Sequence, residues 1–245
     1  APGAGVRPLL DAWDGLHEYL GSVGDLLYFQ TTAGAPNGRV IALRADDPSP
    51  ERRQVVVPEQ PERLEAASLV GGHVLAQYLE DARSRVRVHL LDGSLRNEVP
   101  LPGSGTAYGF APDRTGAETF FAYTDYLTPP SLYRYDLAGD EVSLFRAPRM
   151  AFDPAPYVAE QVFYASKDGT RVPMTIVRRR DAPRDGSQLL LLYGYGGFDI
   201  PLTPAFSPAV AAWLELGGAY AVANLRGGGE YGAEWHQAGT KLRKQ

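Results

Sequence analysis

Side chains that could carry out chemistry are few in this sequence of 245 residues. Cysteine is absent, which excludes disulfides, zinc–thiolate sites and a thiol nucleophile. The histidines are too scattered along the chain to predict a metal site, and no cofactor is indicated. These histidines are His17, His73, His89 and His236. The most distinctive candidates are two glycine-rich turns, 193–198 and 224–232, which also contain tyrosine, arginine and glutamate.

The composition excludes several classes of function. With 24 basic and 29 acidic side chains, the formal charge is −5, which argues against nucleic acid as a partner. No apolar run approaches the roughly 18–20 residues that span a bilayer, so we expect no membrane partner and a soluble protein, cytoplasmic or periplasmic. No Gly-Lys-Ser/Thr follows either glycine-rich turn, as a P-loop requires. We expect the glycines to let the backbone turn sharply or approach a ligand.

The elements that position the two turns read as strand, helix, strand. Segment 188–193 is continuously apolar, which suits a strand covered by helices on both faces of a largely parallel sheet. Ser207 and Pro208 form an N-cap and first-turn pair for a helix that ends at 217–218. A second apolar strand, 219–224, follows. Each turn therefore stands at the carboxyl end of a strand, where α/β folds place their chemistry.

The first two thirds of the chain contain a repeat of 46 residues. One set of strand-like segments is 27–31, 73–77 and 119–123, and a second set is 39–43, 85–89 and 131–135. Turn sequences at 35–38, 92–93 and 138–140 separate strands. In segment 85–90, Val86, Val88 and Leu90 alternate with polar residues, which predicts a half-exposed strand. Such a unit has the size of one β-propeller blade, and evenly spaced hairpins of a β-sandwich are the alternative.

We therefore predict about three blades of an incomplete β-propeller ring followed by the beginning of an α/β-hydrolase domain. Three blades cannot close a ring, so strand edges would be left open. The proline-rich segment 151–156 places the boundary, which gives a partial propeller at 1–150 and the start of the hydrolase domain at 151–245. The segments 160–165 and 171–178 are expected to form a hairpin.

The two glycine-rich turns closely resemble those of the prolyl oligopeptidase family of serine peptidases. Further segments resemble the family in the same order, namely 126–130, 160–164, 166–170 and 234–236. The aromatic first turn is more similar to the proline-specific branch than to oligopeptidase B. The resemblance implies a propeller that caps an α/β-hydrolase domain and restricts entry to short peptides.

The resemblance also implies roles for two residues. The hydroxyl of Tyr195 would donate a hydrogen bond to the oxyanion of the tetrahedral intermediate, and Phe198 would form a wall of the pocket for the proline ring. The alternatives are that Tyr195 only packs over its loop and that Phe198 belongs to the core. Arg226 and Glu230 could face substrate, brace the loop as an ion pair or lie in solvent, so they receive no role. His236 precedes any nucleophile, which makes it a structural residue.

The sequence departs from the family in one respect. No Gly-x-Ser-x-Gly occurs in the 245 residues, so the family's nucleophile and the later Asp and His are missing. The chain is thus expected to be part of a serine endopeptidase that cleaves short peptides after proline, and to be inactive alone. Its expected partners are short proline-containing peptides and the remainder of its own chain. Alternatives are a propeller interaction module with a vestigial hydrolase segment, or a related hydrolase such as oligopeptidase B.

Overall fold

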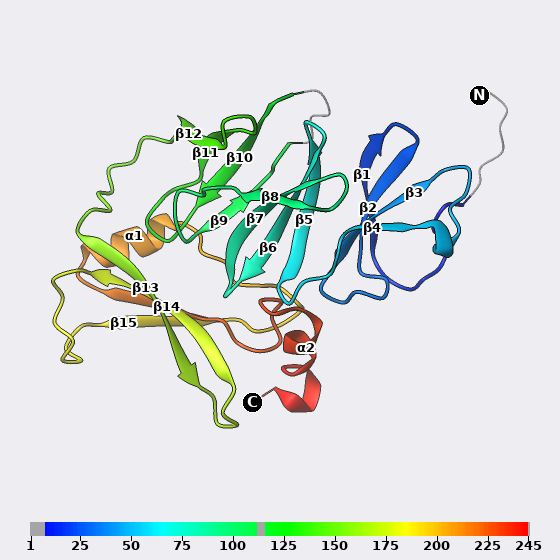
Figure 1. Ribbon diagram of the computed structural model, residues 1–245. Helices are drawn as coiled ribbons and strands as arrows, with labels where there is room; N and C mark the ends of the chain where they lie inside the picture. The colour runs from blue at the N-terminus through cyan, green and yellow to red at the C-terminus, as the bar shows by residue number, and fades with distance from the viewer. Residues whose placement is uncertain (1–7, 112–115, 245) are drawn as a thin grey trace.

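The computed structural model describes residues 8–111 and 116–244. Residues 1–7 and 112–115, in the predicted domain 1–150, and residue 245, in the predicted domain 151–245, lie outside the described residues. The described strands form four sheets of four strands each. Three of these sheets follow one another in chain order in Figure 1, from blue to green, and the fourth lies alongside them with the helices.

The first three sheets are antiparallel meanders. The first contains β1 (His17–Val23), β2 (Leu26–Thr31), β3 (Arg39–Arg44) and β4 (Gln54–Val57), with a 3-10 turn η1 (Pro50–Arg52) before β4. The second contains β5 (Arg63–Val70), β6 (His73–Glu80), β7 (Arg83–Leu90) and β8 (Leu95–Glu98). The third contains β9 (Thr106–Tyr108), β10 (Glu118–Thr124), β11 (Ser131–Asp136) and β12 (Glu141–Arg146). The six repeated segments are the second and third strands of these sheets, which confirms three blades of an unclosed propeller.

The strand register repeats in the first and third blades and changes in the second. Phe29 pairs with Ile41, and the equivalent Phe121 pairs with Tyr133. In the second blade the pairing moves by one residue, because β6 and β7 are joined by a two-residue turn, Asp81 and Ala82. Both turn residues have positive φ, 49° and 63°, as the primed turns of tight hairpins require.

The predicted alternation in β7 holds only as far as Val88. There the pairing of β7 with β8 shifts by one residue, as in a β-bulge. Beyond Val88, His89 is buried and Leu90 is exposed, so the predicted alternation was wrong at this strand end. His89 Nδ1 lies 3.1 Å from the Gly93 carbonyl oxygen.

The blades are held together by apolar layers between neighbouring sheets. One layer joins the first and second blades and is built from residues such as Tyr28, Val40 and Tyr78. Another joins the second and third blades through residues such as Leu75, Val88 and Phe121. Strand β6 contributes to both layers because its successive side chains point to opposite faces. The middle blade is thus covered on both sides, as in a propeller.

The fourth sheet has the strand order β13-β14-β16-β15. Its elements are β13 (Tyr157–Ala165), β14 (Arg171–Arg179), β15 (Leu190–Gly194), α1 (Pro208–Glu215) and β16 (Ala219–Ala223), followed by α2 (Gly232–Gln237) and a 3-10 turn η2 (Lys241–Arg243). Helix α1 begins after Ser207, whose Oγ accepts a hydrogen bond from the Val210 N–H at 3.5 Å. Leu214 of α1 packs with Val177 and Val222 of the sheet.

Two expectations for this sheet were wrong. It is mixed rather than largely parallel, because only β15 and β16 run parallel while the β13–β14 hairpin pairs antiparallel with β16. In addition, β15 is exposed along its whole length, with Leu192 63% exposed. Helix α1 packs over the other strands, and β15 is the edge strand. An apolar strand is buried only where other elements cover it, and none does so here among the described residues.

Candidate active site

The two glycine-rich turns meet at the same edge of the fourth sheet. Strands β15 and β16 are parallel neighbours, and Gly194 at the end of β15 pairs with Ala223 at the end of β16. The turns that follow must therefore lie side by side. The Asp199 N–H donates to the Gly227 carbonyl oxygen at 3.2 Å. Lys244 Nζ bridges the turns by donating to the carbonyl oxygens of Gly196 and Arg226.

The glycines are needed because the two backbones touch. Gly196 and Gly227 both have positive φ, 60° and 100°. A Cβ atom on Gly227 would lie 2.3 Å from the Gly196 carbonyl oxygen, and one on Gly196 would lie 2.8 Å from the Arg226 carbonyl oxygen. A side chain at either position would push the turns apart.

The turn after β15 holds its two aromatic side chains at the surface. Tyr195 is 42% exposed and Phe198 is 83% exposed, and their ring centroids lie 6.4 Å apart. Phe198 and Asp199 have φ values of 55° and 57°, in the left-handed region that residues with a Cβ rarely adopt. Two such residues in succession store backbone strain, which proteins concentrate at functional sites. Both side chains are therefore exposed beside the second turn.

His236 lies beneath the first turn and contacts backbone. Its Nδ1 is 2.8 Å from the Gly227 carbonyl oxygen and 3.1 Å from the Asp199 backbone nitrogen. This position fits the structural role expected from the sequence. Helix α2 presents His236 to the turns, with Trp235 of the same helix packed edge-on against Tyr231 at 4.9 Å.

Glu230 is fully buried behind the second turn. Its Oε1 accepts hydrogen bonds from the Leu202 N–H at 3.0 Å and from Asn224 Nδ2 at 3.2 Å, and Asn224 also donates to the Leu202 carbonyl oxygen at 2.7 Å. These bonds join the end of β16 to the segment before α1. Glu230 therefore neither lies in solvent nor reaches the surface, and it braces the loop through hydrogen bonds and not through an ion pair.

Arg226 contacts the tip of the β13–β14 hairpin. It forms an ion pair with Asp168 and also contacts Ser166 and Thr170. The Arg226 guanidinium lowers the pKa of the Asp168 carboxyl to about 2, so this carboxyl is ionised at neutral pH. Sequence reasoning offered no way to find this pair, because 58 residues separate its members.

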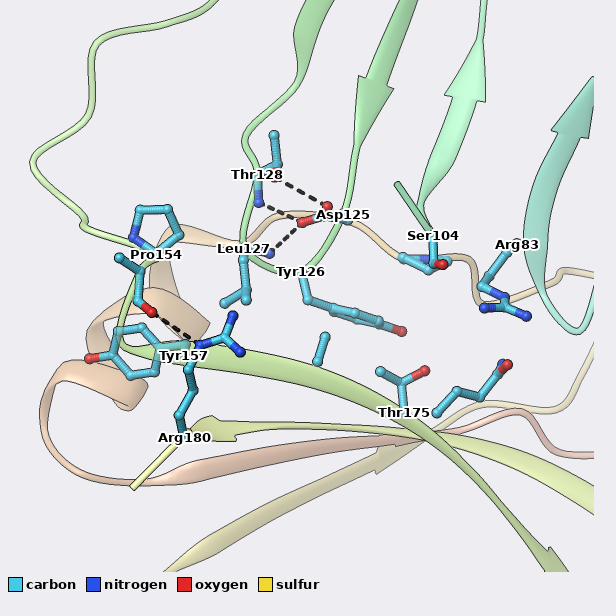
Figure 2. A pocket seen from close by; sticks show the side chains of 14 residues that line it. Arg83, Ser104, Asp125, Tyr126, Leu127, Thr128, Pro154, Tyr157, Thr175 and Arg180 are labelled. Atoms are coloured by element: carbon cyan, nitrogen blue, oxygen red, sulfur yellow. Dashed lines mark hydrogen bonds between the residues drawn. The ribbon is translucent and has the colours of Figure 1, made fainter. Parts of the chain in front are cut away.

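A cavity of 570 Å³ lies between the third blade and the fourth sheet, and the sequence did not indicate it. Figure 2 shows Tyr126 reaching across it, with Arg83 and Arg180 at opposite sides.

The Asp125 carboxylate fixes the loop that carries Tyr126 by accepting from the N–H groups of Leu127 at 2.8 Å and Thr128 at 2.7 Å. Burial raises the pKa of the Tyr126 hydroxyl, whose ring packs into the core beside α1. Segment 126–130, which connects β10 to β11, thus packs the third blade against the fourth sheet.

Polar contacts also join the blades to the turns of the candidate site. Arg63 of β5 pairs with Asp199 at 2.7 Å, and Asp81 accepts from the Tyr231 hydroxyl at 2.6 Å. Gln161 of β13 donates to the Asp81 carbonyl oxygen at 2.7 Å. No group of three or more His, Cys, Asp or Glu side chains is arranged to hold a metal ion in the described ranges. Residues 8–111 and 116–244 also contain no helix long and apolar enough to cross a membrane.

Two family models match the chain. The N-terminal β-propeller domain of prolyl oligopeptidase matches residues 2–148, and the prolyl oligopeptidase family model matches residues 204–245. The first match alone covers more than half of the chain. With three stacked blades and the start of a hydrolase sheet, these matches show that the chain belongs to the prolyl oligopeptidase family.

Relatives and solved structures agree with this assignment. The chain is 43% identical over 222 residues to a prolyl endopeptidase of Elizabethkingia miricola, covering 91% of this chain and 31% of the relative. For a prolyl endopeptidase of Elizabethkingia meningoseptica the identity is 40%, covering 97% of this chain and 34% of the relative. A solved prolyl endopeptidase structure superposes with a TM-score of 0.90 at 40% identity, covering 100% of this chain and 36% of that one. The chain therefore spans about a third of the length of its relatives.

A more distant structure shows the same fold. Prolyl oligopeptidase B from Galerina marginata, bound to a 35mer hydrolysis and macrocyclization substrate, matches with a TM-score of 0.89 at 28% identity. The match covers 100% of this chain and 35% of that one.

Proposed function

We propose that this chain is part of a serine endopeptidase that cleaves short peptides after proline, and that it supplies three propeller blades and one side of the active site. The observation that carries the proposal is the meeting of the two glycine-rich turns at the ends of β15 and β16, with Tyr195 exposed beside them. The identity of 40–43% to prolyl endopeptidases supports the preference for proline. The proposed partners are proline-containing peptides and the remainder of the polypeptide.

The proposed chemistry is acyl transfer. A serine outside these 245 residues would attack the carbonyl carbon of the proline residue, and the carbonyl oxygen would become an oxyanion. The Tyr195 hydroxyl donates a hydrogen bond to this oxyanion, which carries more charge than the ground-state carbonyl and so gains more from the donor. Phe198 offers an apolar ring for contact with the proline side chain.

The first measurement is the intact mass of the polypeptide from which these residues come, followed by a peptide assay. We expect a mass well above 26.6 kDa and hydrolysis of a chromogenic peptide with proline before the scissile bond. Faster cleavage after arginine would favour the oligopeptidase B alternative. A source polypeptide of 26.6 kDa would contradict the proposal and favour the interaction module, and the isolated chain is expected not to hydrolyse peptides.

The two site residues are separated by one kinetic experiment in the full polypeptide. Tyr195→Phe is expected to lower kcat by roughly 10²–10³-fold, because one oxyanion donor is lost. Phe198→Ala should mainly raise KM for proline substrates. Tyr193→Phe removes a hydroxyl two residues earlier on β15 and is the matched control. Equal turnover by Tyr195→Phe and the wild type would refute the oxyanion role.

A further inference from the structure

The tip of the β13–β14 hairpin is a tight loop that presents one carboxylate oxygen of Asp168 to the second glycine-rich turn. The Ser166 N–H donates to the Thr170 carbonyl oxygen at 2.8 Å, and Gly169 has a φ of 82°. Asp168 Oδ1 accepts from the Thr170 N–H at 3.1 Å, which fixes the side chain against its own loop. Oδ2 is left to face the second glycine-rich turn.

A single guanidinium joins this loop to the second turn. Arg226 Nη1 donates to Asp168 Oδ2 and, at 3.3 Å, to Thr170 Oγ1, while Nη2 donates to Ser166 Oγ at 3.3 Å. The Arg226 side chain is only 26% exposed. A planar guanidinium held by three side chains has little rotational freedom, so it ties the Arg226 side chain to the hairpin loop. The Arg226 carbonyl oxygen accepts from Lys244 Nζ at 2.9 Å.

The Arg226 backbone in turn contacts the residue that follows Tyr195. The Arg226 carbonyl oxygen lies 2.8 Å from where a Cβ atom on Gly196 would be, and Lys244 Nζ donates to the carbonyl oxygens of both Gly196 and Arg226. We therefore expect a shift of Arg226 to displace Gly196 and the adjacent Tyr195.

We propose that Arg226 is a positioning residue for the oxyanion donor: its ion pair with Asp168 ties the second glycine-rich turn to the β13–β14 hairpin and thereby holds Tyr195 in place. This inference rests on the proposed function of Tyr195. It assigns Arg226 to the catalytic step and not to substrate binding, because its guanidinium is occupied by the hairpin loop. The expected signature is a loss in kcat with little change in KM, since a misplaced donor weakens the transition state more than the ground state.

The test uses kinetics of the full polypeptide on a chromogenic proline-containing peptide. Arg226→Met is expected to lower kcat by about 10²-fold, the scale of a displacement of about 1 Å at a reacting centre. Asp168→Asn keeps a side-chain oxygen for the Thr170 N–H but removes the charge, so it should give a smaller loss of the same kind. Arg226→Lys retains the charge without the fork and should fall between Arg226→Met and wild type. Arg179→Met breaks an exposed ion pair with Asp181 at the other end of the same hairpin and is the control.

A double-mutant cycle with Tyr195→Phe separates positioning from general stability. If Arg226 acts through the Tyr195 hydroxyl, Arg226→Met should lower kcat less than about threefold in the Tyr195→Phe background. Full additivity, or a change in KM alone, would overturn the inference while leaving the role of Tyr195 intact. Unchanged turnover in Tyr195→Phe alone would instead overturn the proposed function on which the inference rests.

Discussion

At the scale of single residues, Gly196 and Gly227 constrain how closely the two glycine-rich turns of the candidate site can pack. Both residues are in left-handed conformations, and neither position has room for a methyl group. From the sequence, these glycines were predicted to let the backbone turn sharply or approach a ligand. The contact itself could not be predicted, because it depends on the parallel pairing of β15 with β16.

Gly227→Ala is expected to destabilise the chain by more than about 2 kcal/mol, since strain at a φ of 100° adds to a clash at 2.3 Å with the Gly196 carbonyl oxygen. Urea unfolding followed by circular dichroism measures the change. Gly186→Ala is the matched control, because Gly186 has a φ of 81° with nothing within 4 Å of the added methyl group. It should cost only about 1 kcal/mol. Equal costs for the two variants would show that the turns can move apart freely.

At the scale of elements, the repeat predicted the central strands because apolar residues recur at one spacing. The shifted register of the second blade could not be read in the same way. Its turn at Asp81 and Ala82 lacks the glycine or asparagine that usually marks a two-residue hairpin. The exposure of β15 was missed for another reason. Apolar composition predicts that a strand will be covered, but it does not say which segment covers it.

The exposed strand β15 should make the isolated 245-residue chain self-associate. An apolar edge strand offers the N–H and C=O groups of its open side and both of its faces to a second copy. Leu192→Lys places a charge in the middle of this strand and is expected to shift the chain toward monomer in sedimentation velocity runs at equal concentration. Leu216→Lys, at a leucine that is 83% exposed beyond α1, is the control. Association that Leu216→Lys reduces as strongly as Leu192→Lys would place the contact elsewhere.

At the scale of the whole molecule, the blades and the fourth sheet meet through charged groups that the sequence could not bring together. Arg63 of β5 reaches Asp199 of the first glycine-rich turn, 136 residues later. Glu65 lies 2.8 Å from the same guanidinium. Burial is the main cause that raises the pKa of the Glu65 carboxyl, with Arg63 opposing and the charges of Asp199 and Glu230 adding to the rise. Burial at this interface therefore opposes ionisation of the Glu65 carboxyl.

This arrangement predicts a pH dependence of stability. Because the pKa of Glu65 is higher in the folded chain than the usual 4.5, the folded state holds the proton more tightly than the unfolded state. The stabilising contribution of protonated Glu65 is complete below about pH 4.5 and is lost as the pH rises through the folded pKa. Glu65→Gln should thus increase the free energy of unfolding most at neutral pH, and the gain should shrink toward pH 4.5. Urea midpoints between pH 4.5 and 8 measure it, with Glu141→Gln on β12 as the exposed control. A gain that grows as the pH falls would mean that the ion pair with Arg63 outweighs burial.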